Sequence, residues 1–366
     1  MRVPEHPRGI LLLAHCLLGD SLVMLPALHA LRAEFPEARI GLVSERHGRK
    51  TRIRAADVLA GRGLVDEFHE MLVDANPLAK LANRLRLLLR LRLQRWDLGI
   101  VLVPPHPPAS SSLFEVFGRY LTRFGARRVL LPGPVPTVRR DREGCALPAP
   151  HVADTLLAVL APLLPPAEMG NAQFKLPPLA ADRAGGDWPP GTVPVAVAPA
   201  TNMPCKQWPP ERYAEVLRGL AQVAPIHPVM FGAAGDRALC EQVLASLPTG
   251  GTLVVGETIA HAASRLRGCA MYLGNDTGVM HLAAAVGKPC VAVFSARDVP
   301  GAWYPYGTGH RVFRTPLPCD ACFGHSCPLH TDECILSIQA GDVLRACKET
   351  LAALGGPCQP CAESPE

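Results

Sequence analysis

Short apolar runs alternate with stretches of helical periodicity along most of this chain. Residues 10–14 form an uninterrupted apolar run, and leucines at helical spacing follow over residues 22–35, where Pro36 ends the predicted helix. Further apolar runs at residues 40–43 and 98–103 indicate buried strands. This alternation predicts a parallel α/β sheet of the doubly wound, Rossmann-like kind in the first half of the chain.

The second half repeats the pattern after a change in composition. Residues 166–194 are rich in proline and glycine and lack periodicity, which is typical of a linker. Five apolar strands are predicted beyond it, at residues 195–198, 228–231, 253–255, 271–273 and 291–294. The sequence therefore predicts two α/β domains, residues 1–165 and 195–350, with a cleft between them and a mobile tail at 351–366.

Composition narrows the class of protein. The chain has 366 residues and a formal net charge of +5. The apolar run near the N-terminus is broken by His15, Gly19 and Asp20, and no run approaches the roughly 18 apolar residues that span a bilayer. We therefore expect a cytoplasmic protein. No block is basic or aromatic enough to favour nucleic acid as a partner.

Arginines are concentrated in the first half of the chain, at residues 84–95, 119–128 and 139–142. This bias indicates an anionic partner for that half. In the first block, four leucines fall on one helical face together with an arginine: Leu81, Leu85, Leu88, Leu89 and Arg92. One interpretation is a half-buried helix whose arginine stems cover apolar surface. The other is a basic helix that faces lipid head groups or an anionic glycolipid at the membrane surface.

A dense polar signal lies at residues 274–289, between two predicted strands. Asp276, Thr277 and Gly278 would lie at the carboxyl end of a strand and the start of a helix, where backbone N–H groups and the helix dipole favour a phosphate. The alternative is that Asp276 or Thr277 only caps the helix and Gly278 only allows close packing. These residues alone do not decide between the two. Asp20, just before the first predicted helix, poses the same choice between an N-cap and a functional carboxylate.

Together these segments resemble the glycosyltransferases of family nine, the ADP-heptose:lipopolysaccharide heptosyltransferase group. The resemblance covers residues 9–346, and its motifs are Gly19-Asp20, Leu25-Pro26-Ala27-Leu28, Phe35-Pro36, Lys206-Gln207-Trp208-Pro209, Asp276-Thr277-Gly278-Val279-Met280-His281-Leu282-Ala283-Ala284-Ala285, Phe294 and Trp303-Tyr304-Pro305. The family implies a GT-B architecture, an α/β fold in which two Rossmann-like domains face each other across a cleft. It implies that the first domain holds the acceptor and the second the nucleotide sugar, with anomeric inversion and no catalytic metal.

The resemblance implies roles for individual residues. Asp20 matches the family's catalytic aspartate, the base that takes the proton of the acceptor hydroxyl. Lys206 matches its phosphate-binding lysine, and Thr277 and Gly278 would hold the donor diphosphate with backbone amides. We assign Asp276 to the donor sugar, because a carboxylate repels a diphosphate unless it bonds a sugar hydroxyl or a cation.

Two further residues and one departure complete the comparison. His281 lies a helical turn beyond Asp276 and is either a donor to a phosphate oxygen, which we favour, or a satisfied core histidine. Asp236, in a glycine-rich turn, would take the place of the family's ribose-binding acidic residue. Residues 294–298 depart from the glycine and threonine that the heptosyltransferases usually show, so the sugar and the base of the donor stay open.

The sequence thus predicts an inverting glycosyltransferase. It would move heptose or a related sugar from a nucleotide-diphosphate donor, such as ADP-heptose, to a lipopolysaccharide core or similar anionic glycolipid at the inner face of the cytoplasmic membrane. The alternatives are a non-catalytic nucleotide-sugar-binding or metal-binding module, and a nucleotide-sugar epimerase on a similar two-domain fold.

A cysteine-rich loop at residues 319–334 is the other dense chemical signal. Cys319, Cys322, Cys327 and Cys334 would close a tetrahedral structural zinc site. An iron–sulfur cluster lacks its usual spacings here. The alternative is four reduced or partly disulfide-paired cysteines in a proline-rich loop.

Overall fold

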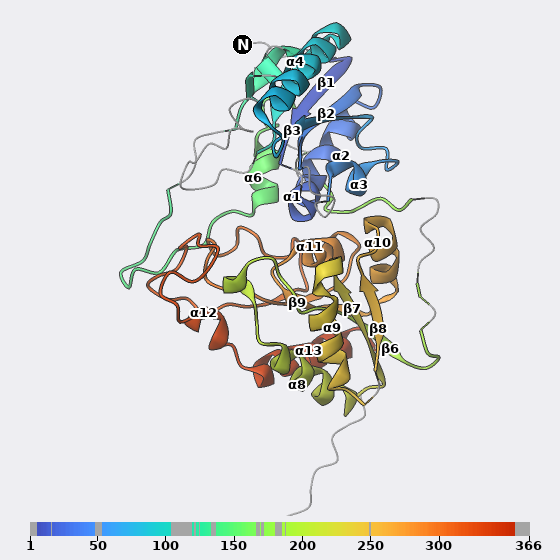
Figure 1. Ribbon diagram of the computed structural model, residues 1–366, viewed down its shortest axis with the longest axis vertical. Coiled ribbons are helices and arrows are strands. Elements are labelled where there is room, and N and C mark those ends of the chain that lie inside the picture. Colours follow the sequence, from blue (N-terminus) through green and yellow to red (C-terminus); the bar gives the residue numbers. More distant parts are fainter. Residues whose placement is uncertain are drawn as a thin grey trace, which may run out of the picture. The chain divides into compact units, whose positions relative to one another are not determined.

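The computed structural model divides the chain into two compact units (Figure 1). It describes residues 6–15, 17–47, 53–103, 119–120, 122–123, 125–132, 137–165, 169, 172–179, 185–186, 188–248 and 250–355. Unit 1 comprises Met1–Arg139 and Pro150–Leu179, and unit 2 comprises Arg140–Ala149 and Ala180–Glu366. The last passage between the units falls inside the expected linker, residues 166–194. Of the expected tail, residues 356–366 lie outside the described residues.

Unit 1 is built on a five-stranded parallel sheet in the order β3-β2-β1-β4-β5. The strands are β1 (Gly9–Leu13), β2 (Arg39–Arg46), β3 (Glu67–Leu72), β4 (Trp96–Val101) and β5 (Ala126–Leu130). β1 is buried along its whole length, as an uninterrupted apolar run in the middle of a parallel sheet should be. The chain runs from β1 out to β3 and then returns to β4 on the other side of β1, which confirms the predicted doubly wound sheet.

The described helices of unit 1 are α1 (Leu18–Val23), α2 (Leu25–Glu34), α3 (Ala55–Leu59), α4 (Pro77–Gln94) and α6 (Val152–Ala158). The single helix expected over residues 22–35 is wrong. Pro26 has no N–H to donate to the carbonyl of Leu22, so α1 ends and α2 begins with the proline in its first turn. α4 is half-buried, and it buries Leu87 and Leu91 while the row formed by Leu81, Leu85 and Leu89 stays exposed.

Unit 2 is built on a six-stranded parallel sheet in the order β11-β10-β9-β6-β7-β8. The strands are β6 (Val193–Ala198), β7 (Ile226–Gly232), β8 (Thr252–Val255), β9 (Met271–Asn275), β10 (Cys290–Val293) and β11 (Arg311–Phe313). The five strands predicted for this half are confirmed, and β11 is an addition. The chain runs from β6 out to β8 and returns with β9 on the other side of β6, so the point where strand order reverses lies between β6 and β9.

The α-helices of unit 2 are α8 (Pro210–Ala221), α9 (Arg237–Ala245), α10 (Ile259–Gly268), α11 (Gly278–Ala285), α12 (Glu333–Leu336) and α13 (Ala340–Ala353). Two short 3₁₀ turns precede helices, η1 (Pro204–Lys206) and η2 (Ala234–Asp236). The core of the unit includes Trp208 and Tyr213, whose rings meet edge to face with centroids 4.8 Å apart. Among the described residues, every helix is too short or too polar to traverse a lipid bilayer.

Candidate functional site

Three loops meet at the carboxyl edge of the unit 2 sheet. Lys206 ends η1 in the loop after β6, Asp276 directly follows β9, and Asp298 lies in the loop after β10. Because β6, β9 and β10 are adjacent parallel strands, the loops that follow them gather at one edge beside the point of strand-order reversal. The structure therefore brings together Lys206 and Asp276, two predicted site residues 70 positions apart, and adds Asp298.

These side chains form a charge cluster with Arg297. The Nζ of Lys206 lies 2.5 Å from Oδ2 of Asp276 and 3.4 Å from Oδ2 of Asp298. The Nη1 of Arg297 donates to both carboxylate oxygens of Asp298, at 2.8 and 2.6 Å. Two cations thus face two carboxylates, and the four formal charges cancel. We call these four residues the charge cluster.

Burial and charge shift the pKa values of Asp276 and Lys206. Burial raises the pKa of Asp276 above its ordinary value, and the charge of Asp298 adds to the rise, while Lys206 opposes it. Burial by itself would lower the pKa of Lys206, but the charges of Asp276 and Asp298 outweigh that effect and raise it. Lys206 is therefore a protonated, nearly buried cation whose partners are two carboxylates.

Asn275, the last residue of β9, holds the surrounding loops in place. It is fully buried, and its Oδ1 accepts hydrogen bonds from the Tyr213 hydroxyl at 2.8 Å and the Trp208 backbone N–H at 3.3 Å. Its Nδ2 donates to the carbonyl oxygen of Pro199 at 2.7 Å. A single buried amide thus ties the loop after β6, which carries Lys206, to the end of β9, which carries Asp276.

The start of α11 bears on the choice between a helix cap and a phosphate site. Thr277 occupies the N-cap position, but its side chain does not bond the backbone of the helix. Its hydroxyl lies 3.4 Å from that of Tyr272 instead. Gly278 is the first helical residue, and the Asp276 carboxylate is paired with Lys206. Thr277 is thus not a side-chain cap, which leaves the phosphate interpretation of this helix start as a prediction.

His281 and Asp236 have local structural partners. His281 lies within α11, is 3% exposed, and its ring meets that of Trp303 edge to face with centroids 6.0 Å apart. Asp236 follows β7 and accepts a hydrogen bond from the backbone N–H of Ala233 at 2.7 Å. Asp236 therefore stabilises its own turn at the same edge of the sheet, and the ligand roles of both residues stay predictions.

Asp20 belongs to unit 1, in the first turn of α1. Its Oδ2 accepts a hydrogen bond from the backbone N–H of Leu17 at 3.3 Å, and the residue is partly exposed. This bond is of the N-terminal capping kind that we considered as the alternative for Asp20. Each carboxylate oxygen can accept more than one hydrogen bond, so capping and acting as a base are compatible.

The cysteine-rich loop packs beside the charge cluster. The Nε of Arg297 donates to the carbonyl oxygen of Gly324 at 2.9 Å, and its Nη2 to that of Phe323 at 3.1 Å. The Cys205 thiol also bonds the Gly324 carbonyl, at 3.3 Å. These contacts hold the guanidinium of Arg297 where it pairs with Asp298, so the loop positions one cation of the cluster.

The four cysteines of this loop, Cys319, Cys322, Cys327 and Cys334, are free thiols. Burial raises the pKa of Cys327, but hydrogen bonds from nearby backbone N–H groups outweigh it and lower that pKa. Within the described part of the chain, no three side chains of the metal-ligating types lie close enough together to hold an ion. The structural zinc therefore stays a prediction from the spacing of the four cysteines alone.

Asn275, Arg297 and Asp298 were not predicted as site residues. Arg297 and Asp298 follow a buried strand, as Asp276 does, and that position was the available signal. Which charges pair across the loops depends on the packing of three strands, and the sequence does not encode that in any local pattern.

The sequence of this chain is similar to those of known glycosyltransferases. Residues 173–331 match the family model of glycosyltransferase family 9 (heptosyltransferase). Lipopolysaccharide heptosyltransferase 2 of Escherichia coli (strain K12) is 34% identical over 96 residues, which cover 25% of this chain and 27% of that protein. Lipooligosaccharide heptosyltransferase 2 of Campylobacter jejuni is 24% identical over 151 residues, which cover 40% and 47%. The matches thus span between about a quarter and a half of these relatives.

Solved structures extend the comparison over the whole fold. A family 9 glycosyl transferase from Veillonella parvula superposes with a TM-score of 0.71 at 18% identity, covering 96% of this chain and 99% of that one. The E. coli ADP-heptose lps heptosyltransferase II gives a TM-score of 0.65 at 20% identity, covering 95% and 100%. The protein therefore has the GT-B fold of these enzymes, and its residues 173–331 are similar to glycosyltransferase family 9 (heptosyltransferase).

Proposed function

We propose that this protein is an inverting glycosyltransferase. It moves heptose or a related sugar from an ADP-heptose-like donor to a lipopolysaccharide core or a similar anionic glycolipid at the inner face of the cytoplasmic membrane. The observation that carries the proposal is the charge cluster at the strand-order reversal of unit 2, within the residues similar to family 9. Ligands of doubly wound sheets bind at this place.

A diphosphate can bind at the charge cluster by replacing Asp276 as the partner of Lys206. A diphosphate entering at the start of α11 meets backbone N–H groups and the positive end of the helix dipole. It competes with Asp276 for Lys206, while Asp298 keeps its two bonds from Arg297. The Asp276 carboxylate, released from Lys206, then accepts a hydrogen bond from a hydroxyl of the donor sugar. A carboxylate beside the diphosphate is in this way compatible with donor binding.

The transfer step needs a base and a stabilised leaving group. The acceptor hydroxyl oxygen attacks the anomeric carbon from the face opposite the nucleotide, and its proton passes to the Asp20 carboxylate. The bond between the anomeric carbon and the β-phosphate oxygen breaks, and its electron pair leaves with the nucleoside diphosphate. Lys206 and the N–H groups at the start of α11 stabilise that negative charge. Inversion follows from the single displacement.

The test is a transfer assay with a panel of nucleotide sugars and a glycolipid acceptor. We expect sugar transfer to the acceptor, and a loss of roughly 100-fold or more in kcat for Asp20→Ala, which is the usual contribution of a general base. Asp57→Ala is a matched control. Asp57 lies in the first turn of α3 and accepts the same type of bond, from the backbone N–H of the N-cap residue Arg54, at 2.9 Å. If the two variants transfer equally well, Asp20 is only a cap. Sugar isomerised without an acceptor would indicate an epimerase, and donor binding without transfer a non-catalytic module.

A further inference from the structure

Helix α4 presents two apolar faces. Leu87 and Leu91 are buried in the core of unit 1. On the opposite side, five leucines at spacings of three or four residues are between 54% and 81% exposed: Leu78, Leu81, Leu85, Leu89 and Leu93. We call these five residues the leucine row. One helix needs a single apolar face to join a core, so the leucine row is apolar surface that unit 1 does not use.

The charge of this helix has one sign. Residues 77–95 contain six basic side chains and no acidic one; the basic residues are Lys80, Arg84, Arg86, Arg90, Arg92 and Arg95. Arg86 and Arg90 lie one turn apart and fall between the leucine row and the face that packs on the sheet. A row of exposed leucines flanked by arginines is the pattern of helices that lie in the interface of a lipid bilayer.

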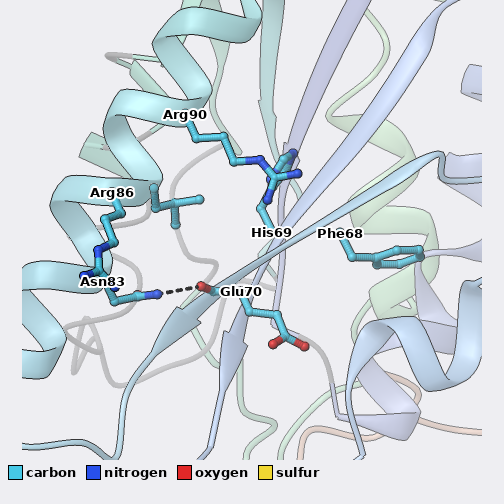
Figure 2. A pocket seen from close by; sticks show the side chains of 7 residues that line it. Phe68, His69, Glu70, Asn83, Arg86 and Arg90 are labelled. Atoms are coloured by element: carbon cyan, nitrogen blue, oxygen red, sulfur yellow. Dashed lines mark hydrogen bonds between the residues drawn. The ribbon is translucent and has the colours of Figure 1, made fainter.

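A pocket of about 300 Å³ opens beside the same arginines, between α4 and β3. Arg86 and Arg90 of α4 both line it (Figure 2), and Asn83 is held by a bond from its Nδ2 to the backbone oxygen of Glu70, at 3.3 Å. Glu70 is the one acidic residue that lines the pocket, and its carboxylate pairs with a cation outside the lining. The carboxylate of Glu70 lies 3.1 Å from Arg46, a cation that is not in the lining. The pocket therefore has a net positive lining, which suits an anion.

His69 supplies a buried polar group to this pocket. It is 1% exposed, and neither ring nitrogen makes a hydrogen bond within the described chain, although Nε2 lies 3.5 Å from a carboxylate oxygen of Glu67. Figure 2 shows the Arg90 side chain extending toward the His69 ring. Burial of an imidazole that makes no hydrogen bond is energetically unfavourable. An anion in the pocket would accept a hydrogen bond from the ring N–H and so offset this cost.

We propose that α4 docks this protein on an anionic lipid bilayer. The leucine row enters the boundary between head groups and acyl chains, and Arg86 and Arg90 bind a lipid phosphate at the mouth of the pocket. The charge of the helix argues against a symmetric pairing with α4 of a second copy, since two such helices would bring twelve cations together without a carboxylate. The proposal stands apart from the donor site, because docking requires no sugar transfer.

The test is co-sedimentation of the full chain with vesicles. One set is phosphatidylcholine alone, and in the other about a third of the lipid is phosphatidylglycerol. We expect binding to the anionic vesicles that weakens steeply as salt rises above about 0.1 M. Leu85→Gln with Leu89→Gln should weaken it by roughly tenfold or more. Two leucines of unit 2 that are equally exposed, Leu329 and Leu354, serve as the matched control, and their replacement by glutamine should change nothing.

A second pair of variants tests the phosphate pocket. Arg86→Gln with Arg90→Gln and Lys80→Gln with Arg92→Gln each remove two positive charges from the same helix. A diffuse attraction predicts equal losses of about 25-fold, at roughly fivefold per charge, whereas a phosphate held at the pocket predicts a distinctly larger loss for the first pair. Equal losses would contradict the proposal that Arg86 and Arg90 bind a lipid phosphate at the pocket.

Binding to both vesicle types alike, or self-association of the chain through the leucine row without vesicle binding, would overturn the docking surface. Asp20→Ala should bind vesicles as the unaltered chain does. The docking proposal and the transfer proposal can therefore fail separately.

Discussion

Lys206 neutralises two buried carboxylates, so its replacement by methionine should destabilise unit 2. Methionine keeps most of the apolar stem but removes the charge that lies 2.5 Å from Asp276 and 3.4 Å from Asp298. Both carboxylates then depend on Arg297, which already donates two bonds to Asp298. Removal of one partner from a buried ion pair costs about 3–5 kcal/mol. Because Arg297 remains, we expect the lower end, about 3 kcal/mol in the free energy of unfolding at about pH 8.

The loss should depend on pH. The pKa of Asp276 is raised by burial, so the folded state holds its proton to a higher pH than the unfolded state does. A carboxyl of this kind contributes stability below its unfolded pKa of about 3.9, and that contribution is lost as pH rises through the folded pKa. Without Lys206 the folded pKa rises further. Because a lower pH favours the protonated carboxyl, the variant should differ less from the unaltered chain at about pH 5 than at about pH 8.

Urea unfolding followed by circular dichroism at both pH values measures this difference. Arg237→Met is the control, because Arg237 pairs with Glu241 at 3.5 Å where both side chains are 54% exposed, and such pairs contribute under about 1 kcal/mol. The double variant Lys206→Met with Asp276→Leu should recover part of the loss, since no carboxylate is left without its lysine. A loss below about 1 kcal/mol for Lys206→Met, or an equal loss at both pH values, would refute the charge cluster as described.

Three other predictions concern single residues. Asn275→Ala should cost about 2–4 kcal/mol in urea unfolding, because it leaves two buried donors, the Tyr213 hydroxyl and the Trp208 backbone N–H, without their acceptor; a loss below about 1 kcal/mol would contradict this role. Burial and Arg90 lower the pKa of His69 to about 4, so stability should fall by up to about 3 kcal/mol from pH 6.5 to 4, and His69→Phe should flatten that slope. Gly274→Ala should lower the melting temperature, because its Cβ would lie 2.7 Å from the Ala198 carbonyl oxygen, which cannot move without disturbing β6; an unchanged melting temperature would contradict it.

The sequence predicted the strands that contain a run of apolar residues and missed β3 and β11. β3 was missed because three of its six residues are polar, as an edge strand with one side not covered by a neighbouring strand allows. β11 was missed because it has only three residues. Of α4, the sequence showed leucines on both faces, and only the packing on the sheet decides which face is buried.

The candidate site was predicted in parts. Lys206 and Asp276 were both expected, but as a phosphate ligand and a sugar ligand, and their ion pair was not foreseen. Such a pair depends on which loops the parallel strands bring to one edge, and on burial that excludes water from the charges. No local pattern in the sequence carries that information.

Binding of ADP measured by calorimetry tests the central claim, a diphosphate site at the charge cluster, most directly. The account predicts that ADP binds at least about tenfold more tightly than AMP, since the second phosphate reaches Lys206 and the start of α11. It also predicts that Lys206→Met loses this preference while Asp20→Ala keeps it. ADP and AMP binding with equal affinity, or a preference that survives in Lys206→Met, would contradict the account.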